Sequence, residues 1–456
     1  MLLLLLHGFV EGIRWQIVPA YGVAFVLMLI AVVPTPLRLP RYLKVALSLF
    51  GILITIIALL LGYLLPVFHL PPPSGSFAVG TTSLHLRDES RPETITANPT
   101  DVRELMVQVW YPAVPQATAT HPYMHPELAK TLAVNYGLPG FMLSHFNLIQ
   151  THTAPDAPVA SEGDLFPAII FSPGYKSHSS MYTAQLEALA SHGYIVFAID
   201  YTYETPLSIF PENDLRFLDP AYTDVWKNIS WEPVEASINA FREADSITAK
   251  RQHVSQYLSH IPYTARVDNW TQDVSFVIDQ LQSKLQLPNR PLFNRVDINN
   301  IGAMGHSLGG ATSTVACARD SRIRAGINMD GSQWGSLMGD TITQPFLWIT
   351  AEQDLATSAV DLDAFIYNQV SVGDFYHLSV AQATHSNFYD LSLWSKYTPL
   401  TQTGTIDGHK MVEITNRCSV AFFDKYLKDK PVVIEDLTKE FNKLSNSNYE
   451  NPTPKP

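Results

Sequence analysis

One stretch, residues 298–318, constrains the fold of this chain more than any other. It reads INNIGAMGHSLGGATSTVACA. The apolar start predicts a strand, GHSLG at residues 305–309 predicts a sharp turn, and the small residues after it predict a helix. A serine between two glycines in a strand–turn–helix is the setting in which the G-x-S-x-G pattern exposes a nucleophile. Ser307 is therefore the candidate nucleophile, rather than an ordinary serine in a glycine-rich turn.

The charge distribution separates the N-terminal region from the rest of the chain. Residues 1–70 hold four basic residues against Glu11, which gives a net charge of +3. Since the whole chain has a net charge of −12, the remaining residues carry −15. An acidic body offers no basic stripe for nucleic acid, and we expect no nucleic-acid partner. The two cysteines, Cys317 and Cys418, are expected to be buried thiols, which excludes a disulfide-stapled secreted fold.

Two uncharged apolar runs dominate the N-terminal region, at residues 15–33 and 45–68. Each is long enough to cross a hydrocarbon core of about 30 Å, so residues 1–70 are predicted to be a membrane anchor with two transmembrane helices. Arg38, Arg41 and Lys44 lie between the runs, and no Lys or Arg follows the second run until Arg87. The positive-inside rule then predicts a multi-pass membrane protein with an extracytoplasmic catalytic domain.

The remaining chain alternates between strand and helix patterns. A proline-rich linker is expected at residues 71–78, a catalytic domain at 79–440 and a disordered tail at 441–456. Apolar runs predict strands near residues 166–172, 194–200, 323–329, 345–351 and 375–380. Helix patterns between them predict an α/β fold with a mostly parallel central sheet flanked by helices. Residues 233–285 are expected to be mostly helical, with a break at Pro262.

Residues 201–232 lack periodicity but are dense in aromatic side chains. A long insertion without secondary structure after a strand is typical of a lid or a pocket wall, and a packed surface loop fits the pattern equally well.

A nucleophilic serine needs a base, and three histidines follow Ser307 in the chain. His377 falls within a strand pattern, which favours a packing role in the core or a place on the surface. His409 lies in a polar segment, which favours exposure to solvent. His385 follows the last expected parallel strand, in the sequence ATHSNFYD, where a loop can bring it to the end of the sheet. His385 is therefore the candidate base.

Two carboxylates, Asp330 and Asp354, lie at strand ends where an acid could orient the base. The usual order of elements in such folds favours Asp354, but the residues alone leave both open, since each also suits a helix cap or a turn. No H-E-x-x-H, calcium-loop or glycine-rich phosphate-binding spacing occurs, so neither a metal ion nor a cofactor is expected.

Several stretches resemble the plasma-type platelet-activating-factor acetylhydrolases, the calcium-independent group VII phospholipases A2 of the α/β-hydrolase superfamily. They are residues 172–175, GHSLGGAT at 305–312, LASHGYIVFAID at 189–200, NMD at 328–330 and HSNFYD at 385–390. The resemblance covers roughly residues 75–430 and leaves out both predicted membrane helices.

The resemblance implies an α/β-hydrolase fold with Ser307 as nucleophile and His385 as base. The family's acid lies 23 residues after its serine, which is the position of Asp330, so Asp354 becomes the weaker option. It also implies an oxyanion hole made by the backbone N–H groups of Tyr175 and Leu308.

This chain departs from the family at residues 173–174, where Pro-Gly replaces the usual His-Gly. Because the oxyanion donors are backbone groups, the hole is expected to persist while the acyl pocket changes shape. His306, beside the nucleophile, is expected to be a packing residue or to shape the pocket.

These features together predict a membrane-anchored serine carboxylic-ester hydrolase that cleaves short or oxidised sn-2 acyl chains from phospholipids without calcium. A general short-chain esterase, a polyester hydrolase and a dienelactone-type hydrolase are alternatives on the same scaffold. A catalytically inactive membrane-anchored binding protein is the alternative outside enzymes. The expected partner is a lipid or a small ester, and the sequence does not determine the oligomeric state.

Overall fold

The chain folds into two compact units. The computed structural model describes residues 2–10, 12–32, 40–116, 120–161, 163, 165–221, 225–284, 291–352 and 359–446. The first unit contains residues 1–70, 122–151 and 391–401, and the second contains residues 71–121, 152–390 and 402–456.

The first unit is helical. Its elements are α1 (Leu2–Val10), α2 (Val18–Val32), α3 (Arg41–Leu64), α4 (Pro126–Asn135), the 3-10 helix η1 (Gly140–Leu148), α12 (Leu391–Trp394) and α13 (Thr398–Thr401). Segments far apart in the sequence meet within this unit around Phe146. The Phe146 ring lies 4.7 Å from the Trp394 ring and 6.0 Å from the Tyr123 ring, and Trp394 Nε1 donates to the Tyr123 hydroxyl at 3.0 Å.

Among the described residues one helix, α3, is long and apolar enough to cross a membrane. It has 24 residues, and its apolar side chains are largely exposed. The helix in the first apolar run, α2, has 15 residues and spans only about 22 Å. One such helix does not test for a second span, so the two-span topology stays a prediction. Arg38, on which the predicted orientation partly depends, lies outside the described residues.

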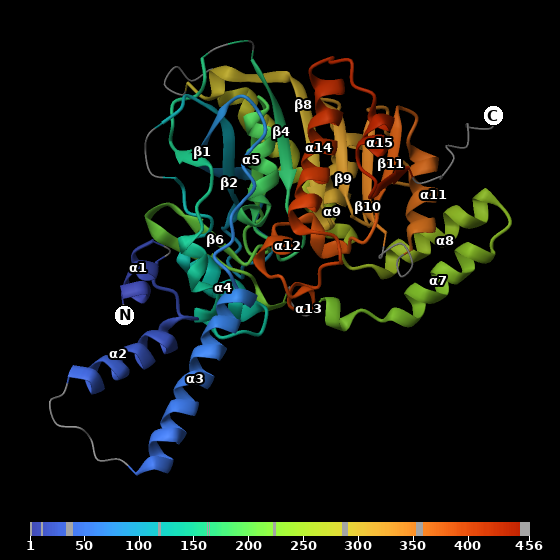
Figure 1. Ribbon diagram of the computed structural model, residues 1–456. Helices are drawn as coiled ribbons and strands as arrows, with labels where there is room; N and C mark the ends of the chain where they lie inside the picture. The colour runs from blue at the N-terminus through green and yellow to red at the C-terminus, as the bar shows by residue number, and fades with distance from the viewer. Residues whose placement is uncertain are drawn as a thin grey trace. The chain divides into compact units, whose positions relative to one another are not determined.

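The second unit is built on a sheet that contains ten strands within the described residues (Figure 1). Its order is β12-β11-β10-β9-β8-β4-β5-β2-β1-β3. The strands are β1 (Ala78–Pro92), β2 (Val102–Ala113), β3 (Thr153–Pro155), β4 (Phe166–Ser172), β5 (Ile195–Asp200), β8 (Val296–His306), β9 (Ile323–Met329), β10 (Phe346–Ala351), β11 (Phe375–Val380) and β12 (Leu444–Asn446). The central strands from β5 to β11 are parallel, while β2 and β12 pair antiparallel at the two ends of that series. The predicted α/β class with a mostly parallel sheet is confirmed.

Helices cover both faces of the sheet. The flanking helices are α5 (Thr183–Ser191), α9 (Thr264–Lys284), α10 (Leu308–Arg319), α11 (Val360–Val370) and α14 (Gly408–Leu427). A Cβ added to Gly302 of β8 would meet Phe423 of α14, whereas one added to Gly326 of β9 would meet Cys317 of α10. Gly326 pairs with the residue next to Gly302, so the two glycines face opposite sides. Covered on both faces, β4 and β5 are wholly buried, which explains their continuous apolar sequences.

The insertion at residues 201–232 contains secondary structure that the sequence did not reveal. A hairpin of β6 (Leu207–Phe210) and β7 (Asp214–Phe217) is joined by the 3-10 helix η3 (Pro211–Asn213), and η4 (Trp226–Asn228) follows. The expectation of a segment without secondary structure is therefore wrong for residues 207–217. Each of its strands has only four residues, the shortest length over which alternation can be read.

The predicted helical region at 233–285 is three helices, α7 (Trp231–Glu243), α8 (Ile247–His260) and α9. The break at Pro262 is confirmed. A second break, between α7 and α8, was not predicted; there the Ser246 side chain caps α8 by accepting the N–H of Ala249 at 3.2 Å.

The last described residues of the second unit, up to residue 446, form regular secondary structure. The 3-10 helix η8 (Ile434–Asp436) and α15 (Leu437–Glu440) lead into β12, which pairs antiparallel with β11. The expected disordered tail at 441–456 is therefore wrong for residues 444–446, which form this strand. Residues 447–456 of that expected tail lie outside the described part of the chain.

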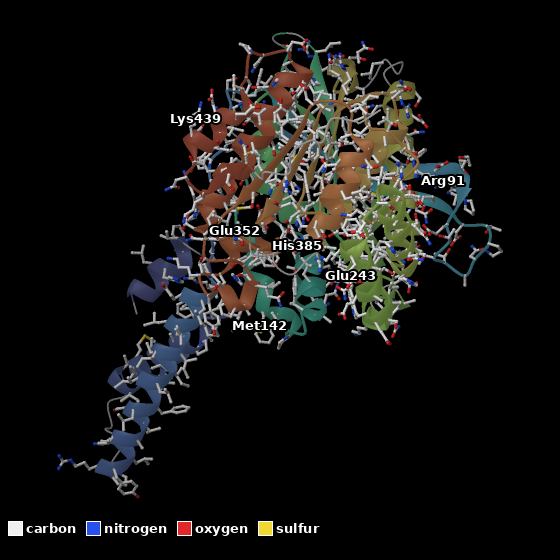
Figure 2. All side chains as sticks on the ribbon, turned by 90° about the vertical axis from the view of Figure 1, so that its right-hand side faces the viewer. Arg91, Met142, Glu243, Glu352, His385 and Lys439 are labelled. Carbon is white, nitrogen blue, oxygen red and sulfur yellow. The ribbon has the colours of Figure 1, made fainter. Side chains whose placement is uncertain are left out.

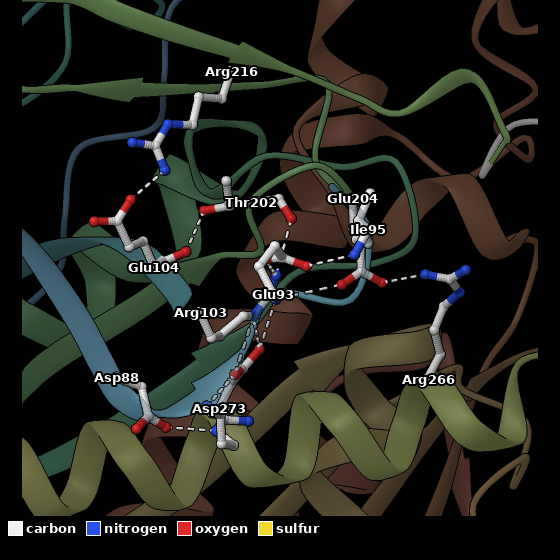
Figure 3. Close-up of polar contacts among 11 residues, drawn as sticks. Asp88, Glu93, Ile95, Arg103, Glu104, Thr202, Glu204, Arg216, Arg266 and Asp273 are labelled. Carbon is white, nitrogen blue, oxygen red and sulfur yellow. Dashed lines mark hydrogen bonds and ion pairs between the residues drawn. The ribbon is translucent and has the colours of Figure 1, made fainter. Parts of the chain in front are cut away.

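A buried ionic cluster joins β2, α9 and the segment after β5 (Figure 3). The Arg103 guanidinium lies 2.9 Å from a Glu93 carboxylate oxygen, 2.8 Å from Asp273 and 3.4 Å from Glu204. Arg266 pairs with the other oxygen of Glu204 at 2.6 Å. Removing one member would leave charges buried without compensation, so the cluster holds the segment after β5 in place.

Candidate active site

The turn between β8 and α10 places Ser307 in strained backbone geometry. Ser307 has φ 56° and ψ −123°, a conformation that L-residues rarely adopt. Neighbouring glycines allow the turn, because a Cβ on Gly305 would lie 2.1 Å from the carbonyl oxygen of Gly309. The Ser307 N–H donates to the carbonyl of Met329 at 2.9 Å, which ties the turn to β9. Strain of this kind is typical of an exposed catalytic serine.

Asp330 and His385 form a hydrogen-bonded pair. Asp330 directly follows β9. His385, which is labelled in Figure 2, begins the 3-10 helix η7 (His385–Phe388) in the loop after β11. His385 Nδ1 lies 2.7 Å from Asp330 Oδ2, while Asp330 Oδ1 accepts the N–H of Ala351 at 2.8 Å. A carboxylate can only accept here, so the Nδ1 atom carries the proton and Nε2 is the basic nitrogen.

The loop that carries Asp330 is fixed by buried polar side chains. The Asn328 side chain both accepts the N–H of Gly331 and donates to its carbonyl, each at 2.8 Å. Asp363 of α11 accepts the N–H of Gln333 at 2.9 Å. These bonds hold Asp330 at a positive φ of 53°, a conformation that needs support from its surroundings.

The segment after β4 lies directly against the nucleophile. A Cβ on Gly174 would lie 3.2 Å from the Ser307 Cβ, and one on Gly309 would lie 2.0 Å from the carbonyl oxygen of Ser172. Tyr175 follows in this segment, and Leu308 is the first residue of α10, where the helix leaves backbone N–H groups unsatisfied. Both expected oxyanion donors thus come from segments that meet at Ser307.

Gly309 is required by this close approach, so replacing it should damage the site. We expect Gly309→Ala to push the segment after β4 away from α10, because the new Cβ would meet two backbone oxygens. Overpacking of this kind costs about 1–3 kcal/mol of stability. We expect a lower melting temperature than that of the wild type. We also expect kcat for an activated ester to fall more than tenfold.

The matched control is Gly339→Ala, because a Cβ at Gly339 meets no atom within 4 Å. Wild-type activity in Gly309→Ala would show that the two segments do not need their close contact.

The other candidates from the sequence do not join this pair. His377 is buried in β11, stacks on Trp348 with ring centroids 4.0 Å apart and bonds Thr350 through Nε2, which confirms a packing role. His409 is exposed in the first turn of α14. Asp354 lies outside the described residues, so the structure does not compare it with Asp330.

A cavity of about 830 Å³ opens beside the pair. Ser307, Asp330 and His385 all line it. Part of its lining is an apolar and aromatic wall, formed by Tyr175, Trp231, Val234, Ile238, Tyr257, Ile261, Tyr263 and Trp334. Most of this wall comes from α7, α8 and the residues between α8 and α9.

The aromatic wall is a connected stack. The Tyr175 ring meets Tyr263 edge-on at 5.1 Å, and Tyr263 stacks on Trp334 at 5.3 Å. Trp334 Nε1 donates to the Tyr257 hydroxyl at 2.8 Å. No local sequence pattern identified this wall, because its members are scattered over separate elements.

A buried carboxyl also lines the cavity. Burial raises the pKa of Asp363 to about 7, above the value of about 3.9 in an unfolded chain. The native state therefore holds this proton more tightly, and the stability it contributes is lost as the pH rises from about 4 to 7. As the pH rises from about 4 to 7, the free energy of unfolding should therefore fall in the wild type. In Asp363→Asn, which has no carboxyl to titrate, this fall should be smaller by up to about 4 kcal/mol.

Denaturant unfolding at pH 4, 5.5, 7 and 8 measures the effect. Asp361→Asn is the control of opposite sign: burial opposes ionisation of Asp361, but its bonds to Arg242 lower the pKa overall. Equal pH slopes in wild type and Asp363→Asn would show that this carboxyl is not held protonated.

Among the described residues, no group of three or more His, Cys, Asp or Glu side chains is placed to hold a metal ion.

Comparison with known proteins relates this chain to acetylhydrolases and esterases. The family model described as platelet-activating factor acetylhydrolase, isoform II, matches residues 66–448. A platelet-activating factor acetylhydrolase of Cavia porcellus is 26% identical over 276 residues, covering 58% of each chain. The Bos taurus protein of the same name is 27% identical over 316 residues, covering 66% of each chain. The matches thus span less than two thirds of these two relatives.

A solved structure shares the fold over most of its length. A ferulic acid esterase from Streptomyces cinnamoneus superposes with a TM-score of 0.64 and 25% identity, covering 84% of this chain and 99% of that one.

Proposed function

The chain belongs to the platelet-activating factor acetylhydrolase, isoform II, family, and on this premise we propose that it is a serine ester hydrolase. The observation that carries the proposal is the 2.7 Å bond between His385 and Asp330 in the cavity that Ser307 also lines. In this proposal Ser307 is the nucleophile, His385 the base and Asp330 the orienting acid.

The reaction proceeds through an acyl-enzyme. Ser307 Oγ attacks the ester carbonyl carbon while His385 Nε2 takes its proton, and Asp330 stabilises the resulting imidazolium. The tetrahedral oxyanion is bound by the backbone N–H groups of Tyr175 and Leu308, each worth about 3 kcal/mol. His385 protonates the leaving alcohol, and the acyl–Ser307 ester forms. Water, deprotonated by His385, then releases the acid and restores Ser307.

The substrate we propose is a phospholipid with a short or oxidised sn-2 acyl chain, cleaved without calcium. The names of the relatives support an acetyl ester of this kind. Hydrolysis of p-nitrophenyl esters from acetyl to palmitoyl, with EDTA present, tests chain length and calcium together. Phospholipids with acetyl and palmitoyl sn-2 chains test the headgroup context. Preference for short chains in both series is expected; preference for palmitoyl would indicate a lipase instead.

A second candidate is hydrolysis of esters of larger or aromatic acids, as in a general or polyester-type esterase. The stacked Tyr263 and Trp334 rings in the cavity wall favour it, because a planar acyl group gains by packing on aromatic faces. Comparing methyl ferulate with an acetyl ester decides between the candidates: faster cleavage of the ferulate favours this one. Absence of hydrolysis of every ester would leave only the inactive binding protein.

We also propose that α3 anchors the chain in a membrane, with the second unit on the extracytoplasmic side. Its length and exposed apolar surface support the anchor. The full-length protein should then stay in the membrane pellet after alkaline carbonate extraction, and protease added outside intact cells should cleave the second unit. Release by carbonate would contradict the anchor, and protection from protease would contradict the orientation.

A further inference from the structure

The proposed oxyanion hole takes its two donors from separate segments, residues 173–176 after β4 and the start of α10. We propose that the hydroxyl of Tyr182 is the positioning group that holds these two segments in register. This inference rests on the proposed function. It assigns Tyr182 no contact with substrate; the residue acts through the backbone that binds the oxyanion.

The Tyr182 hydroxyl bonds to both segments at once. It accepts the backbone N–H of Gly174 at 3.0 Å, and it lies 2.9 Å from Nδ1 of His306. Gly174 directly precedes the first oxyanion donor, and His306 directly precedes Ser307. One buried hydroxyl therefore links the segment after β4 to the nucleophile turn.

Tyr182 itself has little freedom to move. It is fully buried and ends the 3-10 helix η2 (Ser179–Tyr182). Asp200, at the end of β5, accepts both the backbone N–H and the hydroxyl of Ser179 at 2.8 Å. The Tyr182 ring packs edge-on against Phe171 at 4.9 Å and Tyr389 at 5.5 Å. A hydroxyl held in this way can fix the position of its partners.

His306 completes the link as a neutral group. Burial holds the pKa of His306 well below its usual value, and the neighbouring His385 lowers it further. The His306 ring lies 4.5 Å from the His385 ring and 5.8 Å from that of Phe388. A second imidazolium beside His385 would oppose protonation of the base, whereas a neutral His306 can bond Tyr182 without this cost.

Removing the Tyr182 hydroxyl should misalign the oxyanion donors and leave the shape of the substrate cavity unchanged. Deleting a whole oxyanion donor costs about 10²–10³ in kcat, so misaligning one in Tyr182→Phe should lower kcat about 10- to 100-fold. KM should stay within about threefold, since the substrate's ground state gains little from the hole. Affinity for a trifluoromethyl ketone, which forms an oxyanion on Ser307, should fall by the same factor as kcat/KM.

The experiment first establishes hydrolysis with wild type and its loss in Ser307→Ala, so that failure of the proposed function is recognised separately. Tyr182→Phe is then compared with Tyr194→Phe, which also removes a buried hydroxyl, one bonded to Asp424 at 2.8 Å. Tyr194 directly precedes β5, whereas Asp200, which binds Ser179 of η2, is the last residue of that strand. The control should retain wild-type kcat and ketone affinity. A Tyr182→Phe kcat within twofold of wild type, or an equal loss in both variants, overturns the assignment. So does a loss of kcat without a matching loss of ketone affinity.

If Tyr182→Phe does not fold, variants of His306 test the other end of the link. Asn at position 306 keeps a polar atom close to where Nδ1 lies, whereas Leu removes it. His306→Asn should retain at least tenfold more kcat and ketone affinity than His306→Leu. Equal values in these two variants overturn the proposal.

Discussion

Replacing Ser307 with alanine is expected to lower kcat/KM for a short-chain p-nitrophenyl ester by about 10⁴- to 10⁶-fold, the range for loss of a catalytic serine. The physical reason is that alanine lacks the hydroxyl that forms the acyl-enzyme. Alanine has the same Cβ as serine and is therefore no more strained at the φ of 56° that Ser307 adopts, so the fold should be retained.

Ser313→Ala is the matched control for this variant. Ser313 is buried one to two turns further along α10, and its hydroxyl donates to the carbonyl of Gly309 at 3.0 Å. We expect near wild-type activity there. Labelling with a fluorophosphonate should occur in wild type and Ser313→Ala and be absent in Ser307→Ala. Activity that survives in Ser307→Ala would remove Ser307 from the mechanism.

Replacing Asp330 with asparagine is expected to lower kcat about 10⁴-fold near neutral pH, because an amide cannot hold His385 in the tautomer that leaves Nε2 basic. In the variant, the carboxylate oxygen that lies 2.7 Å from His385 Nδ1 is replaced by either the oxygen or the NH2 group of the asparagine side chain. Initial rates with the acetyl ester from pH 5 to 9 measure both the loss and any change in the basic limb.

Asp354→Asn decides between the two carboxylates that the sequence left open. If Asp330 is the acid, Asp354→Asn retains kcat within a few fold of wild type while Asp330→Asn loses it. The reverse pattern would assign the acid to Asp354, as the usual order of elements in such folds favours.

The predictions that held are those encoded within a few consecutive residues. The turn at Ser307 follows from local sterics, since glycines at 305 and 309 are the residues that permit the close backbone contacts seen there. The parallel strands followed from continuous apolar runs such as that of β4, whose residues are all buried. The break at Pro262 followed from the ring's conflict with helical hydrogen bonding.

The predictions that failed, or were never made, concern contacts between distant residues. The β6–β7 hairpin has short, partly exposed strands with no clear alternation. Lys227 and Trp231 of the insertion after β5 do line the cavity, as expected of a pocket wall, but the contribution of Val234 and Ile238 of α7 and Tyr257 of α8 was not predicted. Helical periodicity shows which face of a helix is apolar, but not which cavity that face lines.

The sequence by itself determined the parallel sheet, the nucleophile turn and a short set of candidates for base and acid, because strand, helix and turn preferences act over neighbouring residues. The residue patterns left Asp330 and Asp354 open and only the family resemblance favoured Asp330; the tertiary structure shows its contact with His385, 55 residues away, and the link from Tyr182 to His306, 124 residues apart. These contacts depend on the strand order β11-β10-β9-β8-β4-β5. That order brings the ends of separate strands together, and no local pattern along the chain encodes it.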